Sequence, residues 1–151
     1  MTYERAVENG GTAKICTALV LDDDPMIRSE IGEFLSEMDY KIRYCGDFIG
    51  AMEEMAFDDD VAVIVADYHL MGDQKHNLNG MNFIDCCRMK FPGRDIRYFL
   101  MSGDRAPLAD NKDDKQVTMI SKVTAVEQLT EHLTSLNVCT RLNQFHLRYA
   151  L

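Results

Sequence analysis

Short apolar runs alternate along the chain with segments in which apolar residues recur every three or four positions. Short runs rich in β-branched residues are typical of buried strands, and the second pattern is typical of helices that pack on a sheet. The most apolar run, Val61-Ala-Val-Ile-Val-Ala66, is expected at the centre of the sheet. The pattern predicts strands over residues 17–21, 41–45, 61–66, 96–101 and 117–120.

Helical spacing follows four of these strands, over residues 25–38, 48–55, 81–91 and 124–136. Pro25 suits the first turn of the first helix, and Asp24 can cap it. The segment 105–116 is polar and contains Pro107, so any helix there should be short or irregular. Strands that alternate with helices predict an α/β fold, a doubly wound parallel sheet with helices on both faces.

Composition limits the class of protein. A chain of 151 residues with 46% hydrophobic and 27% charged residues is expected to form one globular domain. No apolar run approaches the ~20 residues of a membrane span and no signal peptide is recognisable, so a cytoplasmic protein is expected. The net charge of −9 disfavours binding to nucleic acid. The five cysteines contain no C-x-x-C pair and are expected to be reduced thiols.

Polar residues follow the predicted strands at the points where they end. Asp22 and Asp23 follow the first strand, Asp67 the third, Ser102 the fourth and Lys122 the fifth. In a doubly wound sheet the ligand site lies beyond the carboxyl ends of the strands. An aspartate at such a place more often caps a helix or a turn, which is the role expected of Asp24. The combination of the other residues favours a functional site.

Three carboxylates at one sheet edge repel one another and therefore require a cation. Oxygen ligands with open positions favour Mg²⁺. A lysine and a serine hydroxyl can bind the oxygens of a phosphoryl group, and a carboxylate among them can be the nucleophile. Asp67, at the end of the central strand, is the expected nucleophile, which leaves Asp22 and Asp23 to hold the metal. The acidic run 58–60 is interpreted as a solvated turn.

These motifs resemble those of the response regulator receiver domain, over about residues 16–136. Leu19-Val-Leu-Asp22-Asp23-Asp24-Pro25 is similar to the acidic pair after the first strand of that family. Val63-Ile-Val-Ala-Asp67 resembles its phosphoacceptor strand. Phe99-Leu-Met-Ser102-Gly and Met119-Ile-Ser-Lys122 resemble the ends of its fourth and fifth strands.

The resemblance implies a flavodoxin-like strand order, 2-1-3-4-5, and a site with assigned roles. Asp67 would accept a phosphoryl group from a histidine kinase or a histidine phosphotransfer protein. Mg²⁺ would be bound by Asp22, Asp23, Asp67 and the backbone carbonyl of His69. Ser102 and Lys122 would bind the phosphoryl oxygens and move the adjoining loops inward. Such a protein is a phosphoacceptor that catalyses its own phosphorylation and dephosphorylation, and is not an enzyme acting on a separate substrate.

The resemblance also implies a division of the chain and a set of partners. Residues 1–15 would be an N-terminal extension, 16–136 the receiver domain, and 137–151 a tail too short to be an output domain. The output would then be binding to an unidentified downstream protein or relay of the phosphoryl group. A homodimer through helix 4 (the short helix expected within residues 105–116), strand 5 (117–120) and helix 5 (124–136) is compatible with it. Neither nucleic acid nor a membrane is an expected partner.

Three departures from the family pattern concern the expected signalling surface. The segment Gly72–Asn79 makes the connection after Asp67 about five residues longer than usual. Val123 follows Lys122 where the family has a proline, and Met119 occupies a position that is usually aromatic.

His69 and Asp104, each two residues beyond a strand end, are expected to pair and to screen the phosphoryl group.

Two other function classes remain open. A phosphohydrolase of the haloacid dehalogenase type also uses an aspartate nucleophile, Mg²⁺, a serine or threonine and a lysine. It needs a further acidic pair at a later strand end, whereas Glu127 and Glu131 fall within a predicted helix. The other class is a receiver-like interaction module that no longer depends on phosphate.

Overall fold

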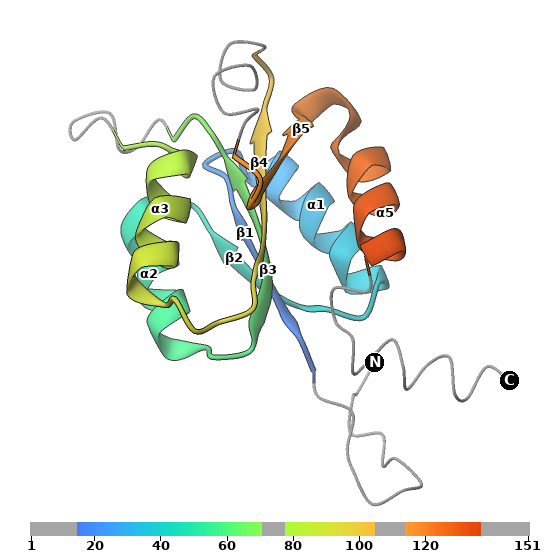
Figure 1. The fold of residues 1–151 in the computed structure, drawn as a ribbon. Coiled ribbons are helices and arrows are strands. Elements are labelled where there is room, and N and C mark those ends of the chain that lie inside the picture. Colours follow the sequence, from blue (N-terminus) through green and yellow to red (C-terminus); the bar gives the residue numbers. More distant parts are fainter. Residues whose placement is uncertain (1–14, 71–77, 105–113, 137–151) are drawn as a thin grey trace, which may run out of the picture.

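The chain forms a five-stranded parallel sheet in the order β2-β1-β3-β4-β5, as predicted (Figure 1). The computed structural model describes residues 15–70, 78–104 and 114–136. Every pair of neighbouring strands is parallel. The strands are β1 (Thr17–Leu21), β2 (Lys41–Cys45), β3 (Val61–Asp67), β4 (Arg97–Ser102) and β5 (Val117–Ser121).

Helices cover both faces of this sheet, so the doubly wound arrangement is confirmed. Helices α1 and α5 lie on one face, and α2 and α3 lie on the other (Figure 1). A single 3-10 turn, η2, joins β5 to α5. The helical elements are α1 (Pro25–Glu37), α2 (Phe48–Phe57), α3 (Gly80–Lys90), η2 (Lys122–Thr124) and α5 (Ala125–Leu136).

Strand β3 is buried on both faces, in agreement with its uninterrupted apolar sequence. Val63 and Val65 pack against α1 and α5, whereas Ile64 and Ala66 pack against α2 and α3. All four side chains are inaccessible to solvent. Successive strand residues point to opposite faces, so one apolar strand supplies both halves of the core. Asp67, the last residue of β3, is therefore held at the centre of the sheet edge.

Side-chain caps fix where the helices begin. The Asp24 carboxylate accepts a hydrogen bond of 2.9 Å from the Met26 N–H, which confirms its predicted role. The side chains of Asn79 and Asn82 each accept from the backbone N–H of the other and form a capping box at the start of α3. The caps satisfy N–H groups that have no acceptor within the helix. They also place the helix starts close to the sheet edge that carries the predicted site.

The interpretation of residues 58–60 as a solvated turn is wrong for Asp58, which is only 8% exposed. One carboxylate oxygen accepts hydrogen bonds from the Thr17 hydroxyl at 3.2 Å and from Arg43 Nε at 3.1 Å. Burial raises the pKa of Asp58, but hydrogen bonds from Asp60, Arg43 and Thr17 outweigh it and leave that pKa below its ordinary value. Asp58 therefore joins the start of β1 and the middle of β2 to the end of α2.

The cysteines differ in part from the expectation of reduced thiols. Cys45, Cys86 and Cys87 are free, but Cys16 is disulfide-bonded. The sequence did not predict this bond, because spacing alone does not reveal which thiols the fold brings together.

Within the described ranges, no helix has both the length and the apolar character needed to cross a membrane. Most of the segment 105–116, and residues 72–77 of the longer connection, lie outside the described residues.

Candidate phosphoryl-transfer site

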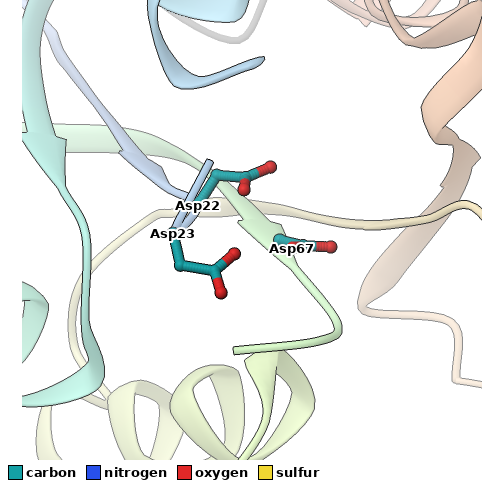
Figure 2. A group of neighbouring side chains, drawn as sticks. All are labelled: Asp22, Asp23 and Asp67. Carbon is teal, nitrogen blue, oxygen red and sulfur yellow. The ribbon is translucent and has the colours of Figure 1, made fainter. Parts of the chain in front are cut away.

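Three aspartates meet at the carboxyl edge of the sheet. Asp22 and Asp23 follow β1, and Asp67 ends β3 (Figure 2). One carboxylate oxygen from each residue lies within 4.8 Å of those of the other two. Asp22 is inaccessible to solvent and Asp67 is 2% exposed, whereas Asp23 is half-buried. The predicted trio is therefore brought together by the crossover that pairs β1 with β3.

The backbone and side chain of Asp22 are held by four contacts. Its N–H donates to the Cys45 carbonyl at 3.1 Å, and its carbonyl accepts from Arg28 Nη1 at 3.0 Å. Its Oδ1 accepts from the Asp24 N–H at 2.8 Å. The other oxygen, Oδ2, is buried, accepts no hydrogen bond from a described residue and lies 3.3 Å from Lys122 Nζ. This oxygen is therefore available to bind a ligand.

Lys122 reaches the acidic group from the end of β5. Its Nζ donates a hydrogen bond of 3.1 Å to Asp67 Oδ2, in addition to its contact with Asp22. One quarter of the side chain is exposed to solvent. The ammonium thus lies between two buried carboxylates and neutralises part of their charge.

Burial dominates the electrostatics of both carboxylates. It raises the pKa of Asp22 to about 6, with a further increase from Asp67 that the Asp24 N–H and Lys122 oppose. Burial also raises the pKa of Asp67, although Lys122 and the His69 N–H lower it. For Lys122, burial lowers the pKa, but the charges of Asp67 and Asp22 outweigh it and hold that pKa above its usual range. The site therefore carries uncompensated negative charge that favours a cation.

The donor set fits Mg²⁺. All three side chains offer carboxylate oxygens, which hard divalent cations prefer, and Oδ2 of Asp22 is buried with an ion pair to Lys122 but no hydrogen bond from a described residue. The His69 backbone N–H hydrogen-bonds to Asp67, so this residue is adjacent to the site. Its carbonyl remains a predicted ligand.

Ser102 ends β4 at the same sheet edge and is 1% exposed. In the ladder Met101 pairs with Asp67, and Ser102 pairs with Ser121, the residue before Lys122. The Ser102 hydroxyl accepts a hydrogen bond of 3.0 Å from the Asp104 N–H. The serine therefore lies between the strands that supply Asp67 and Lys122, as its predicted role requires.

The predicted pairing of His69 with Asp104 is confirmed. His69 Nε2 lies 2.8 Å from Asp104 Oδ2, and the ring also packs edge-on against Tyr68 with centroids 5.0 Å apart. Both partners are largely exposed. The contact joins the loop after β3 to the loop after β4.

Two residues next to the site were not predicted from the sequence. Arg28, in the first turns of α1, contacts the Asp22 carbonyl, and Gln128, at the start of α5, accepts a hydrogen bond from the Ser121 N–H. Their positions soon after a site-bearing loop are the only sequence signal that points to them. The described residues contain no cis peptide bond, so the Lys122–Val123 bond is trans.

Gly80 packs against the backbone of Asp67. A Cβ at this position would overlap the Asp67 carbonyl oxygen, so only glycine fits there. The Gly80 N–H donates to the Tyr68 carbonyl at 2.9 Å, and the Tyr68 N–H donates to the Met101 carbonyl at 2.8 Å. These contacts fix the start of α3 against the end of β3.

Comparison with solved structures shows the same fold in receiver domains of response regulators. The chemotaxis protein CheY4 of Vibrio cholerae is 18% identical with a TM-score of 0.67, over 82% of this chain and 99% of that protein. A CheY-like receiver domain from Methylobacillus flagellatus is 16% identical with a TM-score of 0.68, over 81% and 98%. A signal receiver domain from Pseudomonas fluorescens is 18% identical with a TM-score of 0.68, over 88% and 98%. No protein-family model and no curated protein sequence matches the chain.

Proposed function

We propose that this chain, which has the fold of receiver domains, is a response regulator receiver that accepts a phosphoryl group on Asp67. The observation that carries the proposal is the contact of Lys122 Nζ with both Asp67 and Asp22, beside a third carboxylate at the carboxyl edge of the sheet. An ammonium, a hydroxyl and a group of carboxylates at one point are the set that phosphoryl transfer to a carboxylate requires.

Asp22, Asp23, Asp67 and the His69 carbonyl would hold Mg²⁺. The ion, when bound, neutralises charge on the carboxylates and on the phosphoryl oxygens. Asp22 is held rigidly by Arg28 and by the Asp24 N–H, so its free oxygen is already oriented.

The donor would be the phosphohistidine of a histidine kinase or of a histidine phosphotransfer protein. A carboxylate oxygen of Asp67 bonds to phosphorus while the phosphorus–nitrogen bond breaks, and the departing imidazole nitrogen keeps the electron pair and takes a proton from solvent. Lys122 moves its charge from the Asp67 carboxylate to a phosphoryl oxygen, and the Ser102 hydroxyl donates to another. Attack by water on the acyl phosphate later releases phosphate and restores the carboxylate.

The phosphorylated state would act by changing a protein-binding surface near β5 and α5, because Ser102 and Lys122 follow the strands that lead into it. The setting would be the cytoplasm, where histidine kinases expose their phosphorylated domains, and the target would be a protein. The homodimer through β5, α5 and the helix expected within residues 105–116, most of which lie outside the described residues, stays a prediction.

The test is phosphorylation by a small phosphodonor in the presence and absence of Mg²⁺. The wild type should gain one phosphoryl group that depends on Mg²⁺, and Asp67→Asn should gain none. Asp24→Asn is the matched control, because it keeps the helix cap and alters an aspartate of the same loop that is not assigned to the metal. A phosphoryl group retained in Asp67→Asn, measured by mass spectrometry, would refute the assignment.

A second candidate is a receiver-like module whose interactions do not require phosphate. Val123 and Met119 favour it, because both differ from the residues that the resemblance leads us to expect at the switch. Failure of the wild type to bind beryllofluoride with Mg²⁺ would support this alternative. A haloacid dehalogenase-type hydrolase is disfavoured, since Glu127 and Glu131 lie within α5.

A further inference from the structure

The turn that carries Lys122 is tied to helix α5 by one side chain. Gln128 Oε1 accepts a hydrogen bond of 2.6 Å from the Ser121 N–H and another of 3.3 Å from the Thr124 hydroxyl. Ser121 immediately precedes Lys122, and Thr124 is the last residue of the turn η2. The Gln128 amide therefore bridges the two ends of the segment that contains Lys122 and Val123.

Few other contacts define this turn. The Val123 N–H donates to the Ser121 hydroxyl at 3.3 Å, which is a long hydrogen bond. Val123 itself is 86% exposed and so gains little from packing. Loss of the Gln128 oxygen would remove the acceptor of the Ser121 N–H and leave this part-buried donor to water.

We propose that Gln128 is a positioning residue for Lys122: its amide oxygen holds the β5–α5 turn so that the ammonium stays between Asp67 and Asp22. The proposal rests on the proposed function. It makes α5 part of the phosphoryl-binding apparatus, because a movement of Lys122 toward a phosphoryl group is transmitted through the Ser121 N–H to the first turn of the helix.

The Lys122 ammonium can stay between the two carboxylates only if the backbone of its turn is held in place. The side chain has four methylene groups and a strongly hydrated ammonium, so its location depends on where the backbone places its base. Here Nζ lies 3.1 Å from Asp67 and 3.3 Å from Asp22, and one quarter of the side chain is exposed to competing water. A turn that is free to shift would allow the ammonium to leave the two carboxylates.

If Gln128 positions Lys122, loss of Gln128 should change the affinities for Mg²⁺ and for beryllofluoride in opposite directions. When Lys122 is loosened, the three carboxylates lose their fixed cation, so Mg²⁺ alone should bind more tightly. A bound phosphoryl analogue loses a cationic partner, so beryllofluoride should bind more weakly. If Gln128 served only to stabilise α5, its loss would weaken both or change neither.

The experiment measures Mg²⁺ affinity, and beryllofluoride affinity at saturating Mg²⁺, by isothermal titration calorimetry on the full chain. Gln128→Met preserves length and removes the acceptor. We expect beryllofluoride binding to weaken about tenfold and Mg²⁺ binding to tighten about twofold. Gln128→Glu keeps an acceptor oxygen at this position and should restore most of the beryllofluoride affinity. Glu127→Met, on the same helical turn but exposed, should leave beryllofluoride affinity within about twofold of wild type.

Affinities in Gln128→Met that equal those of the wild type, or that fall together for both ligands, would overturn the proposal. If Gln128→Met does not fold, Thr124→Val is the test variant, because it removes only the exposed hydroxyl donor. It should weaken beryllofluoride binding and tighten Mg²⁺ binding, each by a smaller factor than Gln128→Met. No shift in Thr124→Val would then overturn the proposal. Absence of beryllofluoride binding in the wild type would refute the proposed function itself, so the two failures are distinguishable.

Discussion

His69 Nε2 and Asp104 Oδ2 are 2.8 Å apart, and each residue lies two positions beyond a strand-end residue of the site. Asp67 ends β3 and Ser102 ends β4, so the pair connects the two loops that flank the predicted phosphoryl position. The His69 and Asp104 side chains are 50% and 67% exposed. The contact therefore lies at the solvent side of the site, where water would approach an acyl phosphate.

We expect His69→Ala and Asp104→Ala each to shorten the lifetime of phosphorylated Asp67. An exposed side-chain contact of this kind contributes about 1 kcal/mol or less, which corresponds to about a two- to fivefold faster loss of phosphate. The double variant should be no faster than the faster single variant, because both substitutions remove the same contact. Autodephosphorylation rates that fall or stay level in both single variants would rule out screening.

Lys122→Ala should retain Mg²⁺ binding, with an affinity no weaker than that of the wild type, and uncouple phosphorylation from the β5–α5 surface. The ammonium balances phosphoryl charge that the unphosphorylated protein lacks, so its loss matters most in the phosphorylated state. The measurement is the change in amide chemical shifts of α5 when beryllofluoride is added. Lys115→Ala, just before β5 and remote from the aspartates, is the control. Equal shift changes in the wild type and Lys122→Ala would contradict the prediction.

The pKa of Asp22, raised to about 6, sets the pH dependence of stability in the absence of divalent ions. The folded protein holds this proton more tightly than the unfolded chain, whose ordinary value is 3.8. The stability contributed by Asp22 is therefore greatest below about pH 4 and is lost as the pH rises through about 6.

Asp22→Asn should consequently stabilise the metal-free protein at pH 7.5 by about 1 kcal/mol, less than the pKa change alone implies, because Lys122 loses a partner. The gain should shrink at pH 4.5. Urea unfolding in a chelating buffer at the two pH values tests this. A variant less stable than the wild type at pH 7.5 would show that the carboxylate is not under electrostatic strain.

Arg28 and Gly46 provide a paired test of how Asp22 is held. Arg28→Met removes the donor to the buried Asp22 carbonyl and should cost about 1–2 kcal/mol of stability. Gly46→Ala would place a Cβ 2.9 Å from Arg28 Nη1, so the flexible end of the arginine must shift, which should weaken its contact with Asp22 and destabilise by a smaller amount. The two losses should not add, because they break one contact. Additive losses in urea unfolding would show that each residue acts independently.

Local periodicity predicts the alternation of strands and helices, and the rule that ligands bind at carboxyl strand ends predicts where the three aspartates lie. The strand order is implied only by the resemblance to receiver domains. Strand ends are less well predicted. Asp67, Ser102 and Ser121 remain in the ladder although their polarity suggests that the strands have ended. Backbone pairing continues regardless of side-chain polarity, so each of these strands ends one residue later than predicted.

Contacts between distant residues lie beyond such patterns. Asp58 is buried because Thr17 and Arg43, 41 and 15 residues away, donate to its carboxylate, and no local pattern encodes that meeting. The same holds for Gln128, whose sequence position indicates a helix but not the direction in which its amide points. The sequence likewise predicts Arg28 to be a surface residue, and only the folded structure shows that its guanidinium donates to the Asp22 carbonyl.

The contact of Gly80 with Asp67 has a consequence for protein engineering. The connection that leaves β3 at Tyr68 returns to it at Gly80 through a hydrogen bond of 2.9 Å, so its two ends are already joined at the sheet. The entropy of closing a loop grows slowly with length, by about 0.6 kcal/mol for each doubling. Peptide tags or recognition sequences inserted into this connection should therefore be tolerated without displacing the aspartates, which makes it a natural place to graft new binding specificity onto the scaffold.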